Sequence, residues 1–117
     1  MITFQNEGIY NIQFSLQFAN TDTQIQTGYI WLRKNGVDVS ATAGIVEVAP
    51  KHGTSPGAYI ASWNYFLDFS VNDYIQLAWS SDTGNTVIAS FPAGTSPVHP
   101  LSPGLIFTTQ FVSALPT

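Results

Sequence analysis

The stretch Gly8-Ile9-Tyr10-Asn11-Ile12-Gln13-Phe14-Ser15-Leu16-Gln17-Phe18-Ala19-Asn20 has the most regular alternation of apolar and polar side chains in the sequence. Large apolar side chains occupy every second position from Tyr10 to Phe18, and amides or hydroxyls stand between them. A period of two is typical of a β-strand that buries one face. The stretch therefore predicts a long strand with a core face and a polar face.

Similar segments follow along the chain and are separated by turn signals. Strands are expected at 26–34, 37–39, 45–49, 58–69, 74–80, 86–91 and about 105–112, with loops rich in Gly, Ser and Pro at 50–57 and 92–103. Asn35-Gly36 accommodates the positive φ angles of a tight hairpin turn. Helical periodicity of useful length is absent from the sequence. The pattern predicts an all-β fold, an antiparallel β-sandwich of two sheets.

Composition limits the class of protein. The 117 residues match the size of a single domain, and the absence of cysteine excludes disulfides. Only 9 % of the residues are charged, against about 25 % in an average domain, so part of the surface is expected to be covered by a partner. Three cations and a net charge of −4 argue against nucleic acid. With no apolar run long enough to span a bilayer, no membrane partner is expected.

Three landmarks carry a family likeness. They are Gly8-Ile9-Tyr10 at the start of a long strand, Arg33-Lys34-Asn35-Gly36-Val37 at a hairpin, and Asn72-Asp73-Tyr74-Ile75-Gln76-Leu77 entering a later strand. In this order they resemble the complement-globular-head and tumour-necrosis-factor jelly rolls. Longer segments, 10–17, 30–36, 61–66 and 73–80, are similar to a bacteriophage branch of that fold.

The chain departs from the family pattern at two points. Asn72 stands where the family usually has Gly, and Asn also adopts the left-handed conformation that the turn needs. The family has a further strand before segment 2–5. The resemblance to a single jelly-roll domain over 1–117 therefore implies either that Met1 is an engineered or fragmentary start, or that another chain covers a missing edge strand.

The resemblance implies a compact homotrimer. In such trimers the sheet that contains the Gly-x-Tyr strand, the Asp-x-Ile-x-Leu strand and the C-terminal strand faces the three-fold axis. Carried onto this chain, the interface set is Asn11, Gln13, Ser15, Gln17, Tyr74, Gln76, Ala78, Thr108 and Gln110. Amides and hydroxyls can satisfy one another across a buried interface, whereas unpaired charges cannot. The alternative is an ordinary solvated sheet face, on which Lys and Glu would be more frequent.

Candidate catalytic and metal-binding groups are sparse. His52 and His99 both lie in Pro-rich loops, and neither is near a nucleophile-elbow pattern. The acids are scattered singly, and Asp73 and Asp82 stand in turn sequences, which favours a turn-forming role over a loop calcium site. We therefore expect no catalytic residue, no cofactor and no metal ligand. A calcium site in one of the loops stays open as an alternative.

Surface recognition is expected on a strand and on two loops. Trp63 and Trp79 are expected in the core, whereas Tyr29 and Trp31 share the strand face opposite Ile30 and Leu32. The two Gly-Thr-Ser-Pro loops are exposed elements on which binding can vary. The candidate set is Tyr29, Trp31, His52, Thr54, Ser55, Thr95, Ser96 and His99.

The resemblance leads to one main functional hypothesis and two alternatives. The main hypothesis is a non-enzymatic, homotrimeric structural protein on a bacteriophage virion surface, either a capsid decoration (cement) protein or a fibre-head module, in contact with other virion proteins. The first alternative is the tip domain of a tail fibre, which binds a host receptor or surface glycan. The second is a lectin-like carbohydrate-binding domain that acts alone.

Overall fold

The computed structural model describes residues 1–116, and all regular elements in this range are strands. The strands are β1 (Ile2–Thr3), β2 (Gly8–Asn20), β3 (Gln26–Lys34), β4 (Val37–Asp38), β5 (Gly44–Val48), β6 (Gly57–Phe69), β7 (Tyr74–Ser81), β8 (Thr86–Ile88), β9 (Gly94–Thr95), β10 (Val98–His99) and β11 (Leu105–Ser113). The predicted all-β class is confirmed. The short pair β9 and β10 lies inside the loop predicted at 92–103.

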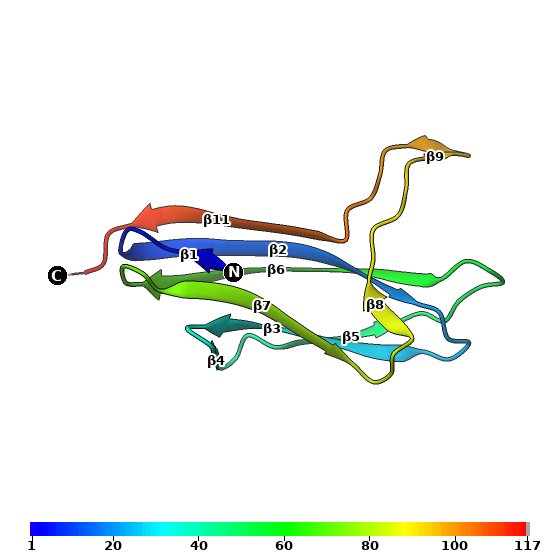
Figure 1. Cartoon of the computed structure of the whole chain (residues 1–117), viewed down its shortest axis with the longest axis horizontal. Coiled ribbons are helices and arrows are strands. Elements are labelled where there is room, and N and C mark those ends of the chain that lie inside the picture. The colour runs from blue at the N-terminus through cyan, green and yellow to red at the C-terminus, as the bar shows by residue number, and fades with distance from the viewer. Residues whose placement is uncertain (117) are drawn as a thin grey trace.

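Two antiparallel sheets form the layers of a sandwich (Figure 1). The first, which we call the β2 sheet, has the order β11-β2-β6, with β8 beside the end of β2. The second, the β3 sheet, has the order β1-β7-β3-β4, and β5 also pairs with β3. The predicted two-sheet antiparallel sandwich is therefore confirmed.

Strand β2 is the centre of its sheet. It pairs with β6 over its whole length, from Gly8 opposite Phe69 to Asn20 opposite Gly57. On its other side it pairs first with β11 and then, at its C-terminal end, with β8. Both sides of its backbone are thus hydrogen-bonded to neighbouring strands, and the face predicted to point into the core does so. The buried side chains on that face are Tyr10, Ile12, Phe14, Leu16 and Phe18.

The core lies between the two sheets. The β3 sheet contributes mainly Ile30, Leu32, Val46, Val48 and Ile75. Trp63 packs against this core as predicted. Trp79 differs from its prediction, because 40 % of it is exposed although its ring contacts the edge of Phe18. It lies beyond the two residues of β7 that β1 covers, at an open edge of the sandwich.

The predicted grouping of strands is wrong in one respect. Strand β7 does not join β2 and β11; it pairs with β3, with Leu77 opposite Leu32. Tyr74, Gln76 and Ala78 therefore lie in the other sheet from the remaining predicted interface residues. The physical reason is length, since the 13 residues of β6 match the 13 of β2 and satisfy its backbone from end to end.

Two turns confirm their predicted chemistry. Asn35 and Gly36 have φ angles of 54° and 80°, as a hairpin turn with two left-handed residues requires. Asn72 has a φ of 71°, which is the left-handed conformation expected where the family usually has Gly.

The other end of the sandwich is fixed by a buried amide. Asn20 Nδ2 donates to the carbonyl oxygens of Gln24, Val48 and Ala49 at 2.9, 3.2 and 3.2 Å. Its partner across the sheet, Gly57, passes so close to the Ala49 carbonyl that a Cβ would overlap it. The chain is thus held firmly just before and just after the loop at 50–56.

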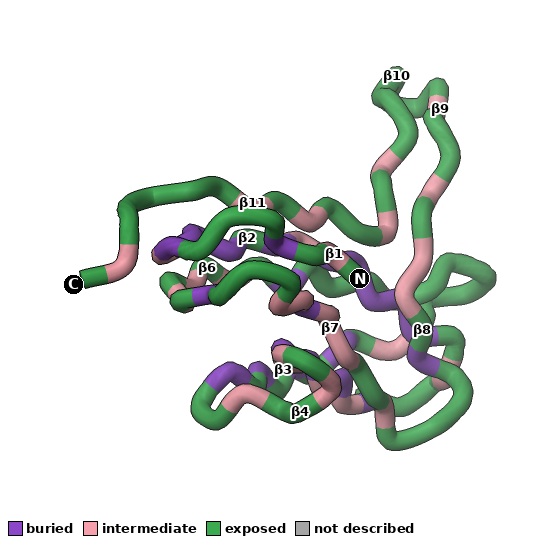
Figure 2. The backbone as a smooth tube through the Cα atoms, turned by 60° about the vertical axis from the view of Figure 1, so that its left-hand side comes forward, coloured by how far each residue is buried: buried purple, intermediate pink, exposed green. Residues whose placement is uncertain are grey.

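Residues 92–101, which we call the arm, leave the body of the sandwich. The arm contains β9 and β10, and both views show it rising beyond β11, the edge strand of the β2 sheet, and away from the β3 sheet (Figures 1 and 2). Figure 2 shows that the arm is mostly exposed, while the buried segments concentrate in the strands of the two sheets.

Candidate functional site

The outward side of the β2 sheet is the largest regular surface that the fold presents. In the register of the three strands, Gln13 lies between Thr108 and Asn64, and Ser15 lies between Ile106 and Ser62. Side chains at these positions alternate with those of the core and therefore point away from it. We define the outer β2 face as Asn11, Gln13, Ser15, Ile60, Ser62, Asn64, Phe66, Ile106, Thr108 and Gln110.

This face is almost free of charge. Asp68 is the only Asp, Glu, Lys or Arg in the four strands of the β2 sheet, and none occurs in the sequence after Asp82. A solvated sheet face would normally carry Lys and Glu, which also discourage unwanted pairing of exposed strands. The composition of this face therefore differs from that of an ordinary solvated sheet face.

Large apolar side chains stand on the same face. Ile60, Phe66 and Ile106 are 60 %, 63 % and 51 % exposed. Gln13, Ser15, Ser62, Ile106 and Thr108, with Phe14 beneath, line a shallow depression of about 110 Å³. The sequence analysis missed Ile60, Phe66 and Ile106. A signal was available, because each is apolar at a position where the alternation of its strand calls for a polar residue.

The predicted interface residues have different fates in this sheet. Gln13, Thr108 and Gln110 are exposed and Ser15 is half-buried. Asn11 is buried, and its Nδ2 donates to Asn64 Oδ1 on β6. Gln17 is buried because its side chain binds the segments on either side of the arm. Its Nε2 donates to the Ala89 carbonyl at 3.0 Å, and its Oε1 accepts from Ser102 Oγ at 3.1 Å.

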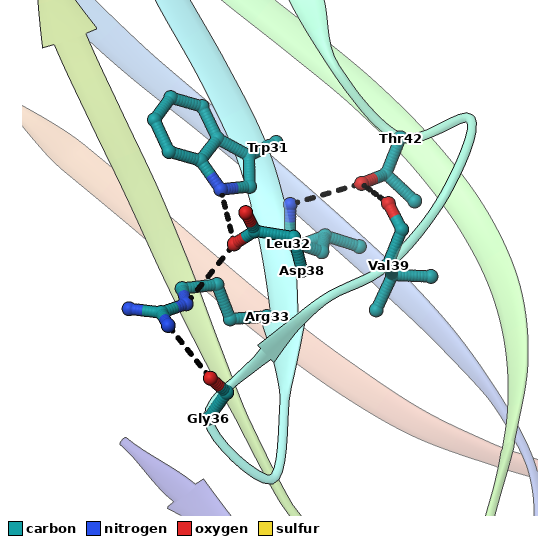
Figure 3. Close-up of polar contacts among 7 residues, drawn as sticks. All are labelled: Trp31, Leu32, Arg33, Gly36, Asp38, Val39 and Thr42. Carbon is teal, nitrogen blue, oxygen red and sulfur yellow. Dashed lines mark hydrogen bonds and ion pairs between the residues drawn. The ribbon is translucent and has the colours of Figure 1, made fainter.

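The outer face of the β3 sheet has the opposite chemistry. Trp31 Nε1 donates to Asp38 Oδ1 at 2.8 Å, and Arg33 Nε lies 3.1 Å from the same oxygen (Figure 3). Arg33 Nη2 also donates to the Gly36 carbonyl at 2.6 Å. The misassigned Gln76 and Ala78 lie on this face, opposite Arg33 and Trp31. On this face the polar side chains pair with one another within the subunit, and Arg33 and Asp38 are partly exposed.

Carboxylates at the ends of the β3 sheet accept hydrogen bonds from neighbouring turns and strands. Asp82 accepts from Thr27 N at 3.2 Å and from the Tyr29 hydroxyl at 3.3 Å, and its charge raises the pKa of Tyr29. Asp73 accepts from Ser70 N at 2.7 Å and from the Asn35 side chain at 2.9 Å, and these bonds lower the pKa of Asp73. The predicted turn-forming role of Asp73 is confirmed.

The predicted recognition residues do not form one site. Tyr29 and Trp31 lie on the outer β3 face, as predicted. His52, Thr54 and Ser55 lie in the loop between β5 and β6, where a hollow of about 290 Å³ is lined by Thr21, Lys51, Gly53, Thr54 and Pro56. Thr95, Ser96 and His99 lie on the arm, on the other side of the sandwich from Tyr29 and Trp31 (Figure 1).

A cleft of about 350 Å³ lies at one edge of the sandwich. Ile75 and Leu77 of β7 face Leu105 and Phe107 of β11 across it, and Met1, Ile2 and Gln76 complete the lining. No acid, base or hydroxyl lies among these residues. The cleft is therefore an apolar gap between two strand edges, without the groups that catalysis requires.

The described part of the chain shows neither a cluster of metal-binding side chains nor a membrane-spanning helix. In residues 1–116, no three His, Cys, Asp or Glu side chains lie close enough together to hold a metal ion. The same residues include no helix of the length and apolarity needed to cross a bilayer. Comparison with protein-family models, with curated proteins and with solved structures finds no match.

Proposed function

We propose that this chain is a non-catalytic structural module that forms a homotrimer through the outer β2 face and is displayed on the surface of a bacteriophage particle. It acts there as a capsid decoration protein or a fibre-head module, in a jelly-roll fold. The observation that carries the self-assembly is the uncharged outer β2 face with Ile60, Phe66 and Ile106 exposed on it. The number three and the virion location rest on the family likeness of the sequence.

Burial of this face is favourable on two counts. Covering the three exposed apolar side chains removes their surface from water, at about 25 cal/mol per Å² of apolar area. The amides and hydroxyls between them, such as Gln13, Asn64 and Thr108, can act as both donors and acceptors toward a second copy of the same face. With no charge in the centre of the face, no buried ion is left without a counter-ion.

Light scattering in solution tests the assembly. We expect a mass of three times 12.7 kDa at micromolar concentration. A monomer at this concentration would contradict the proposal, and a stable dimer would contradict its stoichiometry. Mass spectrometry of particles purified from a lysate of the strain that encodes the chain tests the virion location, since the chain should be present at a fixed ratio to the capsid protein.

A matched pair of substitutions identifies the face. Ile60 and Ile45 are both exposed isoleucines on edge strands, but Ile60 lies on the outer β2 face and Ile45 on the outer β3 face. Ile60→Lys should give a folded monomer, and Ile45→Lys should leave the mass unchanged. Equal behaviour of the two variants would show that assembly does not use the outer β2 face.

A second candidate function, glycan binding, is favoured by one observation. Tyr29 and Trp31 lie side by side on the outer β3 face. Their neighbours on β7, Ser80 and Ala78, are small, and Ile45 of β5 flanks Tyr29 on the other side. Aromatic faces beside polar groups are the usual platform for sugars. In the trimer three such platforms would point outward. A glycan array tests this function, and any binding should be lost in Trp31→Ala.

A further inference from the structure

The outer β2 face is too small to account for a stable assembly by itself. Three strands spaced about 4.8 Å apart and about nine residues long cover an area of roughly 450 Å². A standard stable interface buries about 800 Å² on each partner. The planar area of the face is smaller than this, and each subunit of a trimer has two neighbours, so we expect an adjoining part of the surface to contribute.

The arm adjoins the face and carries exposed apolar side chains. Val98 and Leu101 are 86 % and 57 % exposed. The arm has no Asp, Glu, Lys or Arg, whereas four other loops and turns of the chain carry Asp22, Lys51, Asp73 and Asp82. Single exposed apolar residues are common on protein surfaces and need no explanation. Here they stand on a projection that rises beyond β11, the strand that carries Ile106 and Thr108 of the outer β2 face (Figure 2).

The arm is held in a fixed position at its base. Phe91 and Ser102 exchange two backbone hydrogen bonds of 2.9 and 2.8 Å, just outside the arm. Gln17 binds the carbonyl of Ala89, two residues before Phe91, and the hydroxyl of Ser102 itself. The base is therefore anchored to β2, the central strand of the sheet.

The arm itself is also stiffened. Its two short strands pair through Val98 opposite Thr95 and His99 opposite Gly94, and the His99 ring lies against Gly94. Prolines at 92, 97 and 100 restrict the backbone further. An element that is already ordered loses little conformational entropy when it binds, which is the property of a preorganised contact.

From this placement we infer that the arm is an assembly latch, which reaches past the edge of its own subunit and packs Val98 and Leu101 against the β2 sheet of a neighbouring copy. The inference rests on the proposed homotrimer and names the second element that holds it together. It also reassigns Thr95, Ser96 and His99 from recognition of a host molecule to contact between subunits.

A charge on the arm tests the latch. Val98→Glu changes a side chain that is almost fully exposed in the single subunit, so the fold should be unaffected. We expect the trimer to dissociate at a concentration at least about tenfold higher, as measured by analytical ultracentrifugation. Val37→Glu is the matched control, because Val37 is an exposed valine on the hairpin of the β3 sheet. It should dissociate like the wild type.

The absence of cysteine permits a direct map of the contact. In Val98→Cys the single thiol can carry a benzophenone photo-crosslinker, and the linked peptides can be identified by mass spectrometry. We expect links between subunits, to peptides of β2, β6 or β11. Links confined to one subunit, together with unchanged dissociation of Val98→Glu, would overturn the latch while the trimer stood. A monomeric wild type would overturn both the trimer and the latch.

Discussion

The two outer faces of the sandwich are built on the same alternation but carry opposite chemistry. The outer β3 face holds an ion pair between Arg33 and Asp38, an indole hydrogen bond and charged turns at its ends. The outer β2 face holds amides, hydroxyls and exposed Ile60, Phe66 and Ile106. The low charge of the whole chain therefore hides an uneven distribution. The strands of the β3 sheet carry Arg33, Lys34, Asp38 and Glu47, whereas those of the β2 sheet carry Asp68 alone.

The largest expected effect is that of a charge in the centre of the uncharged face. Gln13→Lys places an ammonium group between Thr108 and Asn64, where neither neighbour can neutralise it. An unpaired charge at a buried interface costs about 3 kcal/mol or more, so the association constant should fall at least about 100-fold. Sedimentation equilibrium measures the change.

The same substitution on the other face is the control for that prediction. Gln76 lies on the outer β3 face opposite Arg33. Gln76→Lys should leave the association constant within about twofold, because the new charge remains in water. An equal loss in both variants would mean that the two faces do not differ in the way the comparison requires.

A smaller effect is expected from breaking the polar network of the outer β3 face. Asp38→Ala removes the acceptor of the Trp31 indole and the partner of Arg33. The side chains of Arg33 and Asp38 are 43 % and 66 % exposed, so the free energy of unfolding should fall by only about 0.5–1 kcal/mol. Chemical denaturation measures this change, and the oligomer mass should not change. A loss of assembly in this variant would show that the interface lies on the β3 sheet and would contradict the proposal.

Acid should act on the β3 side of the molecule. Hydrogen bonds from Ser70 and Asn35 lower the pKa of Asp73 below its ordinary value of 3.8. A lowered folded pKa means that the stabilisation is complete above the unfolded pKa and is lost as the pH falls from 3.8 through the folded value. Asp73→Asn should therefore weaken the pH dependence of the melting temperature in this range. If the melting temperature of the variant falls with acid as steeply as that of the wild type, other carboxylates are responsible for the acid unfolding.

The smallest expected effect is that of salt on assembly. Interactions between exposed charges are screened over about 10 Å at 0.1 M salt, but an uncharged interface has no such interactions to lose. Raising NaCl from about 50 to about 500 mM should change the dissociation constant by less than about twofold. A steep salt dependence would show that charged residues, such as those of the outer β3 face, take part in assembly.

Local features of the fold followed directly from the residues. Strands β2 and β3 have the predicted limits, and the positive φ angles of Asn35, Gly36 and Asn72 fall where the turns required them. Each of these depends on neighbours in the sequence, either through alternation or through the conformational freedom of one residue. They can be predicted because the deciding interactions are local.

Pairing between distant strands could not be obtained in this way. Strands β6 and β7 both alternate, so the pattern alone does not decide which of them lies beside β2. Length and register decide it, with β6 matching β2 from Gly8 to Asn20. The error moved Tyr74, Gln76 and Ala78 to the wrong face and concealed the contribution of Ile60 and Phe66. Segment 92–103 was predicted as an exposed loop, but the pairing of β9 and β10 within it was not, because two-residue strands in a Pro-rich segment leave no periodic signal.

The firm attachment at both ends of the loop between β5 and β6 has a consequence for how the protein can diversify. Asn20 clamps the backbone up to Ala49, and the strand resumes at Gly57, where no side chain fits. Residues 50–56 therefore form a loop whose two ends are held at fixed positions by the sandwich. New sequences grafted between these two points should alter what the tip of the sandwich touches while its folding remains the same.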